Sequence, residues 1–209
     1  MLNLKNFRYR KISQKATVED LVKESVRKLI HMSAAFSVLL AHFFFTFTVY
    51  AVLCGIIVYS VCELLRLNGI RVPLISKITE IASRKTDEGR FVLGPLCLGI
   101  GILLALLFFD ESASAVAIFS LAFGDGLASL VGKIYGQKHF KVVSKKTLEG
   151  SIACFLAVFV STVFVLKNPL RAFFLALIAT FVEVLPLKNL DNIAIPLVVG
   201  FCASVLPLR

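Results

Sequence analysis

The chain has 209 residues, of which 58% are hydrophobic, with no tryptophan and a formal net charge of +10. Soluble domains of this size are much less apolar, and apolar runs of membrane length recur along nearly the whole sequence, so the composition excludes a soluble globular protein. The basic charge does not indicate nucleic-acid binding, because the lysines and arginines lie between apolar runs without any base-reading motif. The five cysteines all lie within apolar runs without a CxxC pair, which is typical of small buried residues.

Residues 1–16 are basic, and we expect them to form an N-terminal segment that precedes one membrane-embedded domain over residues 17–209. Thr17 opens a helix-start pattern, with Asp20 three positions later. The first apolar run begins only near Leu29, after charged residues, so no cleavable signal peptide is expected. Before that run, apolar residues recur at helical spacing on one face, and the opposite face contains Glu19, Lys23, Glu24 and Arg27. This pattern predicts an interfacial amphipathic helix.

The apolar runs predict an all-α polytopic membrane protein with about seven transmembrane helices. The stretch Leu29–Leu67 is too long for one helix and predicts a hairpin. A polar connection follows over residues 68–93, with a second surface helix expected at Pro73–Arg84. The predicted spans are Val26–Phe44, Phe47–Arg66, Gly94–Phe109, Ala113–Lys133, Leu148–Leu166, Pro169–Leu187 and Ile193–Leu206. The third and seventh are short for a full bilayer crossing.

The distribution of basic residues predicts the orientation. With a cytoplasmic N-terminus, all but three of the 23 lysines and arginines lie on the cytoplasmic side, as the positive-inside rule requires. This topology brings polar residues of six spans to one membrane depth, on the side that holds nucleotides. Those residues are Lys28, His31, Glu63, Asp125, Glu149, Glu183 and Asp191.

The run Gly124-Asp125-Gly126 interrupts the fourth predicted span. Two glycines around an acid favour a helix break or a close backbone approach. An unpaired carboxylate in an apolar setting is costly, so its presence favours a metal ligand or a catalytic group. An internal ion pair with a lysine is the alternative interpretation of Asp125.

A second motif, SKKTLEG at residues 144–150, opens the fifth predicted span. Ser144 or Thr147 can cap the helix, whose free N–H groups and positive dipole end suit phosphate. Adjacent lysines supply positive charge, although an ordinary positive-inside loop would also contain them. We therefore expect a phosphate site formed by Ser144, Lys145, Lys146 and Thr147, with Lys133, Gly124 and Gly126 assisting.

Further polar residues are weaker indicators. Arg27-Lys28 precedes the first span and could simply anchor the topology, whereas His31 within that span requires a partner. Glu63 and Arg66 have the i,i+3 spacing of a local ion pair. Near the C-terminus, Asp191 or Asn192 could cap the start of the seventh predicted span or could belong to the site, and the sequence supports both interpretations. The expected supporting residues are Arg27, Lys28, Glu63, Arg66, Glu183 and Asn192.

Three blocks, AFGDGLASLVGKIYG, SKKTLEGSIA and EVLPLKNLDNIAIP, resemble the dolichol kinase, phytol kinase and CTP-dependent diacylglycerol kinase family. The early RKLIH and the later ELLR are similar to the opening pattern of that family, and the match covers most of the chain from residue 27 onward. The resemblance implies a multi-span membrane enzyme that phosphorylates a lipid alcohol with CTP. The spacing of these residues does not itself separate cytosine from adenine.

The combined expectation is a membrane lipid kinase that transfers a nucleotide γ-phosphate to a polyprenol, phytol-like alcohol or diacylglycerol at the cytoplasmic face. Asp125 or His31 would be the catalytic group, and Mg²⁺ would be bound by Asp125 with Glu149 or Asp191. The expected partners are a nucleotide triphosphate, a lipid alcohol and the membrane, with no nucleic acid, and a homo-oligomer is left open. The expected location is the cell membrane of a prokaryote, or the endoplasmic reticulum or plastid of a eukaryote.

Two other functions are considered. A phosphatidate cytidylyltransferase, which would make CDP-lipid, shares the aspartate block and a KKTxEG block, but its closing signature has a Pro-Gly-His-Gly-Gly run and an Asp-Arg-x-Asp. This chain has LPLKNLDN at that place. A non-catalytic membrane protein or a transporter is the second alternative. A carrier would place polar groups near the midplane and on both sides of the membrane, which the cytoplasmic clustering disfavours.

Overall fold

The computed structural model describes residues 18–70, 72–73, 75, 79, 89–138 and 146–206. The predicted N-terminal segment over residues 1–16, most of the surface helix expected at Pro73–Arg84, and Ser144 and Lys145 lie outside the described residues. Within these ranges the chain is helical and contains no strands, which confirms the predicted all-α class.

From the third predicted span on, the described helices follow the predicted boundaries closely, and each span corresponds to one helix or, in the fourth, to a continuous series of three helical segments. The first predicted span, Val26–Phe44, is instead interrupted, because α1 ends at Ser33 and α2 begins at Phe36. In chain order the elements are α1 (Val18–Ser33), α2 (Phe36–Leu67), α4 (Leu93–Phe108), α5 (Glu111–Phe119), the π-helix η3 (Ser120–Asp125), α6 (Gly126–Tyr135), α7 (Leu148–Leu166), α8 (Pro169–Val184), the 3₁₀-helix η4 (Lys188–Leu190) and α9 (Asp191–Val205).

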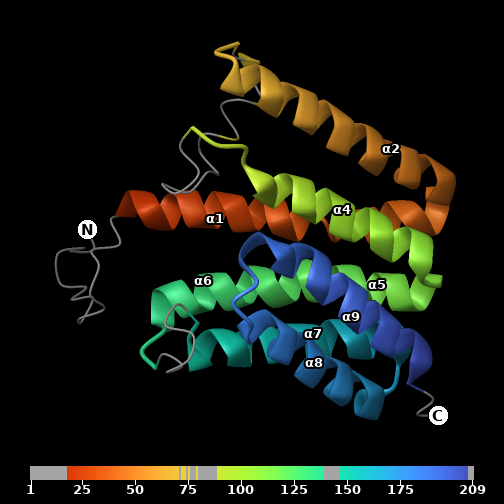
Figure 1. The fold of residues 1–209 in the computed structure, drawn as a ribbon. Coiled ribbons are helices and arrows are strands. Elements are labelled where there is room, and N and C mark those ends of the chain that lie inside the picture. Colours follow the sequence, from red (N-terminus) through yellow and green to blue (C-terminus); the bar gives the residue numbers. More distant parts are fainter. Residues whose placement is uncertain are drawn as a thin grey trace, which may run out of the picture.

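The predicted N-terminal hairpin is present, with its turn inside α2. Phe44 has non-helical backbone angles, with φ −140° and ψ 63°. In Figure 1, α1 and the start of α2 lie in line, and the rest of α2 runs back along the molecule. The returning part packs mainly on α4. Many of its apolar side chains are exposed, including Phe47 and Ile57, which suits contact with lipid.

The segment α5–η3–α6 forms the central rod of the fold. In the most apolar stretch of Glu111–Tyr135, 61% of the residues are buried, against 6% in Leu21–Leu67. The rod contacts α7 on one side and α9 on another, and α1 lies along η3 and α6. Its core residues are small or branched and fully buried, among them Val116, Ile118 and Leu121. Polar groups on this rod are therefore held deep inside the bundle.

Both glycines of the GDG run permit close helix packing. A Cβ on Gly124 would lie 2.8 Å from Val158 of α7, and a Cβ on Gly126 would lie 2.8 Å from Met32 of α1. Larger residues at these positions would force the neighbouring helices apart. The glycines thus bring α1 and α7 against the rod on either side of Asp125.

A second close approach joins α4 and α9. Pro196 lies inside α9, so it offers no N–H to the carbonyl of Asn192 four residues earlier. That carbonyl instead faces Gly101 of α4, where an added Cβ would lie 2.1 Å from the oxygen. Asn192 also donates from Nδ2 to the carbonyl of Gly94, at 3.2 Å. These contacts fix the start of α9 against α4.

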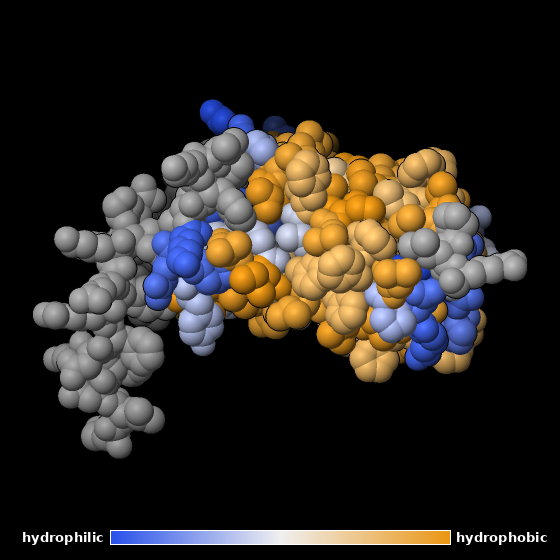
Figure 2. All heavy atoms as spheres, turned by 90° about the horizontal axis from the view of Figure 1, so that it is seen from below, coloured by the Kyte–Doolittle hydropathy of each residue, from blue (hydrophilic) through white to orange (hydrophobic). Residues whose placement is uncertain are grey.

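Three segments of the described chain are long and apolar enough to cross a membrane, by length and composition: Leu21–Leu67, Glu111–Tyr135 and Leu148–Leu166. The apolar helix Leu93–Phe108 is shorter. Figure 2 shows hydrophobic residues over the middle of one face, with hydrophilic residues gathered toward its two ends. The chain is therefore a helical membrane protein, while the count of seven spans and the cytoplasmic N-terminus remain predictions.

Candidate functional site

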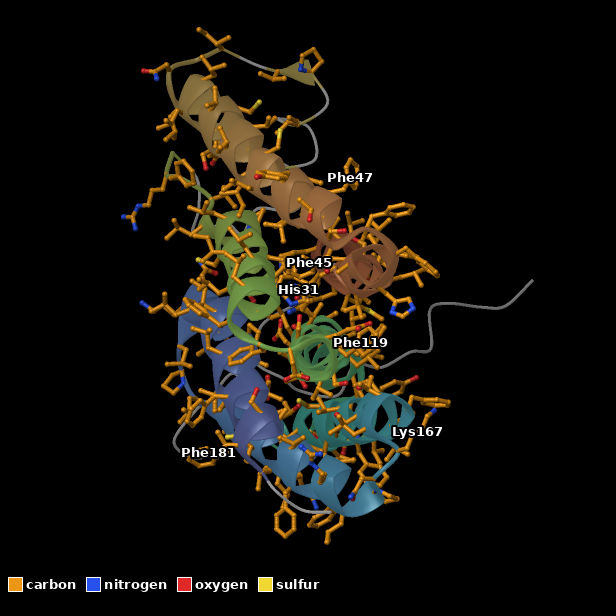
Figure 3. All side chains as sticks on the ribbon, turned by 90° about the vertical axis from the view of Figure 1, so that its right-hand side faces the viewer. His31, Phe45, Phe47, Phe119, Lys167 and Phe181 are labelled. Atoms are coloured by element: carbon orange, nitrogen blue, oxygen red, sulfur yellow. The ribbon has the colours of Figure 1, made fainter. Side chains whose placement is uncertain are left out.

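Asp125 lies at the end of η3 and is almost completely buried. Lys28 of α1 donates from Nζ to Asp125 Oδ2 at 2.5 Å, and His31 Nε2 lies 3.3 Å from the same oxygen. Lys28 and His31 are one turn apart, so they share the face of α1 that contacts the rod. Figure 3 shows His31 among the helices, whereas Phe47 and Phe181 lie on the outside. Three of the predicted residues thus meet inside the bundle.

The π-helix also contributes a carbonyl to this cluster. His31 Nε2 lies 3.2 Å from the backbone oxygen of Leu121. In a π-helix the hydrogen bonds follow an i→i+5 pattern, and such segments frequently occur at functional sites. Because both groups facing Nε2 are acceptor oxygens, this nitrogen carries the ring proton. The arrangement fixes the tautomer of His31 and leaves the lone pair on Nδ1.

Lys146 joins the cluster from the residue pair that precedes α7. Its ammonium donates to Glu183 Oε1 near the end of α8. Burial alone would lower the pKa of Lys146, but the nearby carboxylates of Glu183, Asp125 and Asp191 outweigh it and raise the pKa. Lys146 therefore stays charged among three acids that come from three different helical elements. Asp125, Glu183 and Asp191 are all predicted site residues.

Asp191 begins α9 and precedes its apolar stretch. Its Oδ1 accepts the N–H of the adjacent Asn192 at 2.9 Å, but the N-cap of α9 is Leu190, and no side chain caps this helix. Burial, followed by the negative charge of Asp125, raises the pKa of Asp191 to about 6. Two carboxylates on neighbouring elements thus disfavour each other's charge, which a bound cation would relieve. The capping role considered from the sequence is therefore not observed, and the role of Asp191 in the site stays a prediction.

At the start of α7, one residue caps the helix and the residue before it carries the positive charge. Thr147 is the N-cap, and its hydroxyl accepts the N–H of Gly150 at 3.2 Å. The same hydroxyl would lie 2.8 Å from a Cβ on Gly132, so Thr147 is enclosed where α6 and α7 cross. Thr147 is buried, and its cap fixes the position of Lys146 directly before it. Of the four residues expected to form the phosphate site here, the structure describes these two.

Glu149 is not brought to Asp125. Its carboxylate accepts the backbone N–H of Lys138 at 3.3 Å, on the outer side of the α7 start. The expected metal set of Asp125, Glu149 and Asp191 is therefore not assembled in this structure. Within the described residues no group of three or more His, Cys, Asp or Glu side chains is placed to hold a metal ion.

Glu63 and Arg66 also lie away from Asp125. Arg66 donates two hydrogen bonds of 2.8 Å to the buried carboxylate of Glu63, which also accepts the N–H of Val92 at 2.7 Å. Tyr59 donates to the carbonyl of Val92 at 2.7 Å. These bonds attach the end of α2 to the residue before α4. The local pairing considered from the i,i+3 spacing is observed, and the supporting role in the site is not.

The two faces of α1 lie in different surroundings. Its apolar residues point outward, with Val22 54% and Leu29 63% exposed, while Glu24 is only 9% exposed. On the charged face, Glu24 accepts hydrogen bonds from Ser129 and Lys133 of α6. The predicted separation of apolar and charged faces is therefore present, and its direction suits a membrane, where the lipid-facing side of a helix is apolar and polar groups turn toward protein partners.

Glu24 was missed as a site residue. Its carboxylate accepts hydrogen bonds from Arg27, from the Ser129 hydroxyl at 3.0 Å and from Lys133 Nζ at 3.3 Å. The expected residues Arg27 and Lys133 therefore lie together, one turn from the Lys28–Asp125 pair. The available signal was the spacing of Glu24 and Lys28, which places them on one face of α1.

The donor set can accommodate a nucleotide–magnesium complex. Mg²⁺ is usually held by one or two carboxylates together with phosphate oxygens and water, rather than by a full cage of side chains. Asp125 and Asp191 supply two such carboxylates, and Lys28 and Lys146 supply charges of the sign that phosphate requires. The residues present therefore fit the group.

Comparison with known proteins gives three informative relatives. The chain is 30% identical over 156 residues to "Probable phytol kinase 1, chloroplastic" of Glycine max, covering 65% of this chain and 51% of the relative. It is 26% identical over 202 residues to "Phytol kinase 1, chloroplastic" of Arabidopsis thaliana, covering 87% and 66%. It is 27% identical over 135 residues to "CTP-dependent diacylglycerol kinase 1" of Saccharomyces cerevisiae (strain ATCC 204508 / S288c), covering 63% and 47%.

The chain thus spans between about half and two thirds of the length of these relatives. No protein-family model and no solved structure matches the chain.

Proposed function

We propose that this chain is a membrane lipid kinase. Its similarity to phytol kinases and to a CTP-dependent diacylglycerol kinase is consistent with membership of the polyprenol kinase family, which its sequence blocks predict. In this proposal residues 17–209 form one catalytic domain that transfers the γ-phosphate of a nucleotide to the hydroxyl of a lipid alcohol at the cytoplasmic face. CTP is the proposed donor. The observation that carries the proposal is the cluster of the buried Lys28, His31 and Asp125 with the half-buried Lys146 and Asp191.

The cations of this cluster would neutralise the phosphates. Lys28 and Lys146 lie on opposite sides of Asp125, on α1 and before α7. In this structure Lys28 contacts Asp125, and Lys146 contacts Glu183. Incoming phosphates would replace these carboxylates as the partners of the two ammonium groups. The N–H groups at the start of α7, and Ser144 and Lys145, are proposed to complete the phosphate site.

Asp125 and Asp191 would hold Mg²⁺ from the protein side. The metal, when bound, neutralises charge that develops on the β- and γ-phosphate oxygens. Lys28 would then turn from Asp125 toward phosphate, because the carboxylate has acquired a stronger partner. Glu183, which accepts a hydrogen bond from Lys146 in the nucleotide-free structure, is proposed to hold this lysine in place until phosphate displaces the carboxylate.

The alcohol oxygen would attack the γ-phosphorus as the bond to the β-phosphate oxygen breaks. Such transfer depends mainly on positioning and charge neutralisation, so a strong base is unnecessary. The alcohol proton leaves to His31 Nδ1 in this proposal, because Nε2 is held by Asp125 and Leu121. Asp125 acts as the metal ligand and orients His31 rather than serving as the base.

An apolar groove beside the rod is suited to a hydrocarbon tail. It has a volume of about 640 Å³ and runs between η3–α6 and α7. Phe119, Phe123, Leu127 and Val131 line one side at four-residue spacing. Phe123 directly precedes Gly124-Asp125, so the groove lies within about one helix diameter, roughly 10 Å, of the carboxylate. A lining without charged groups would recognise length and bulk rather than chemical detail.

A substrate panel tests the proposal. Purified protein in lipid nanodiscs would be incubated with Mg²⁺ and either CTP or ATP, together with a polyprenol, phytol, diacylglycerol or phosphatidate, and the products identified by mass. The proposal predicts a lipid monophosphate from at least one alcohol, with CTP as the better donor. A CDP-lipid from phosphatidate would instead establish the cytidylyltransferase alternative. No product with any pairing would contradict both enzymatic functions.

A further inference from the structure

Glu24 organises a second polar tier below the Asp125 cluster. Its carboxylate accepts hydrogen bonds from Arg27 on its own helix and from Ser129 and Lys133 on α6. Along α1, Glu24 precedes Lys28 by four residues, and along the opposing segment Ser129 follows Asp125 by four. The two tiers are therefore one helical turn apart on the same α1–α6 contact.

Charge explains why an acid is needed between these two basic side chains. Arg27 and Lys133 approach each other from neighbouring helices, and without Glu24 their like charges would repel. With Glu24 between them, the three side chains keep a net charge of one positive unit. Glu24 is 9% exposed, so it is not a solvated residue of an amphipathic face. The tier remains attractive to an anion while its cations are held in place.

We propose that Glu24 is a positioning residue of the nucleotide site, holding Arg27 and Lys133 toward the α- and β-phosphates while the Asp125 tier receives the γ-phosphate. This inference rests on the proposed function, because it takes the ligand of the Asp125 cluster to be a nucleotide triphosphate. An extended triphosphate can contact both tiers, since they lie one turn apart along a single helix contact. Glu24 itself touches no reacting atom.

The competing role for Glu24 is a simple structural tether between α1 and α6. A tether and a positioning residue differ in what their removal changes. Loss of a tether lowers stability in the absence of nucleotide, and its effect adds to that of other substitutions. Loss of a positioning residue weakens nucleotide binding, leaves turnover of the bound complex nearly unchanged, and couples to the cation that it positions.

The test measures the Kd of a non-hydrolysable CTP analogue, with Mg²⁺, for wild type, Glu24→Gln, Lys133→Gln and the double variant in nanodiscs. We expect each single substitution to weaken binding by about tenfold, the size of one lost charge-assisted hydrogen bond. The double variant should lose less affinity than the sum of the two single losses, because part of the effect of Glu24→Gln acts through Lys133. For Glu24→Gln, the KM for the nucleotide should rise by a larger factor than kcat falls. Glu111→Gln, which removes an exposed acid at the opposite end of the bundle, is the matched control.

Unchanged affinity in Glu24→Gln would overturn the inference, and so would additive losses in the double variant or a loss of thermal stability without a loss of affinity. If Glu24→Gln does not fold, Glu24→Asp is used instead, because it keeps the charge on a shorter side chain. This variant should bind the analogue more weakly than wild type, and wild-type affinity in Glu24→Asp would also overturn the inference. Wild-type protein that binds the analogue but phosphorylates no alcohol would contradict the proposed function, while the Kd comparison would still test Glu24.

Discussion

At the scale of a single residue, the raised pKa of Asp191 makes the stability of the fold depend on pH. Its pKa is raised to about 6 by burial and by Asp125, so the folded protein binds this proton more tightly than the unfolded chain does. The proton therefore stabilises the fold at low pH, and that contribution is lost as the pH rises from about 4 through about 6. Above this range the charged carboxylate is a cost to the nucleotide-free fold.

Asp191→Asn should therefore stabilise the nucleotide-free protein relative to wild type, by on the order of 3 kcal/mol at pH 7.5 and by only about 1 kcal/mol at pH 4.5. The same substitution should weaken Mg²⁺-dependent nucleotide binding if Asp191 is a metal ligand as proposed, because one of the two proposed ligands is lost. Thermal unfolding at the two pH values, with and without nucleotide and Mg²⁺, measures both effects. A stability difference that does not depend on pH would show that Asp191 does not carry this charge.

The sequence identifies the chemistry of individual residues better than their partners. Lys28, His31, Asp125 and Glu183, which the sequence places at a common membrane depth, come together, and Lys146 from the loop before α7 joins them. Glu63 and Glu149 have the right depth but contact backbone groups near their own helix ends. Depth can be counted along an apolar run, whereas the direction in which a side chain points depends on the rotation of its helix. That rotation is fixed only by packing.

At the scale of helices, glycines determine how closely elements meet. Gly101→Ala places a Cβ 2.1 Å from the Asn192 carbonyl, so α4 and α9 must separate at the start of α9. We expect a destabilisation of about 1–3 kcal/mol, as for other overpacked interiors, together with weaker nucleotide binding through displaced Asp191. Thermal unfolding and nucleotide titration measure the two effects.

Gly94→Ala is the matched control, because it lies on the same helix and an added Cβ meets nothing within 4 Å. It should be neutral or slightly stabilising, since alanine is the better helix former. Equal effects of the two substitutions would contradict a role for the α4–α9 contact.

Helix boundaries were largely predictable, whereas helix faces were not. The runs Leu148–Leu166 and Pro169–Val184 match the expected spans because long apolar segments and their caps are local signals. The sequence separates the apolar from the charged face of α1 but does not predict that Glu24 on the charged face packs on α6, because the pattern of an amphipathic helix is the same in water and in lipid. The π-helix at Ser120–Asp125 was not predicted either. Its wider turns change the phase of the following residues, and no local sequence rule marks them.

At the scale of the molecule, the account places the Asp125 cluster near the cytoplasmic end and the His42–Glu111 pair at the opposite end. His42 Nδ1 lies 2.5 Å from Glu111 Oε1, and both side chains are exposed. In a variant without the native cysteines, Gln137→Cys and Glu111→Cys introduce single reactive thiols near the two ends. An impermeant maleimide should label Glu111→Cys in intact right-side-out vesicles and Gln137→Cys only after permeabilisation. The reverse pattern would place the N-terminus outside.

The most direct test of lipid kinase activity follows the γ-phosphate. Nanodiscs with wild type or Asp125→Asn would receive γ-labelled CTP, Mg²⁺ and the alcohol that the panel identifies, and the label would be traced to lipid or to pyrophosphate. We predict label in the lipid for wild type, and a rate at least about 100-fold lower for Asp125→Asn in protein that still unfolds cooperatively. Label in pyrophosphate, or near-normal transfer by Asp125→Asn, would contradict the account.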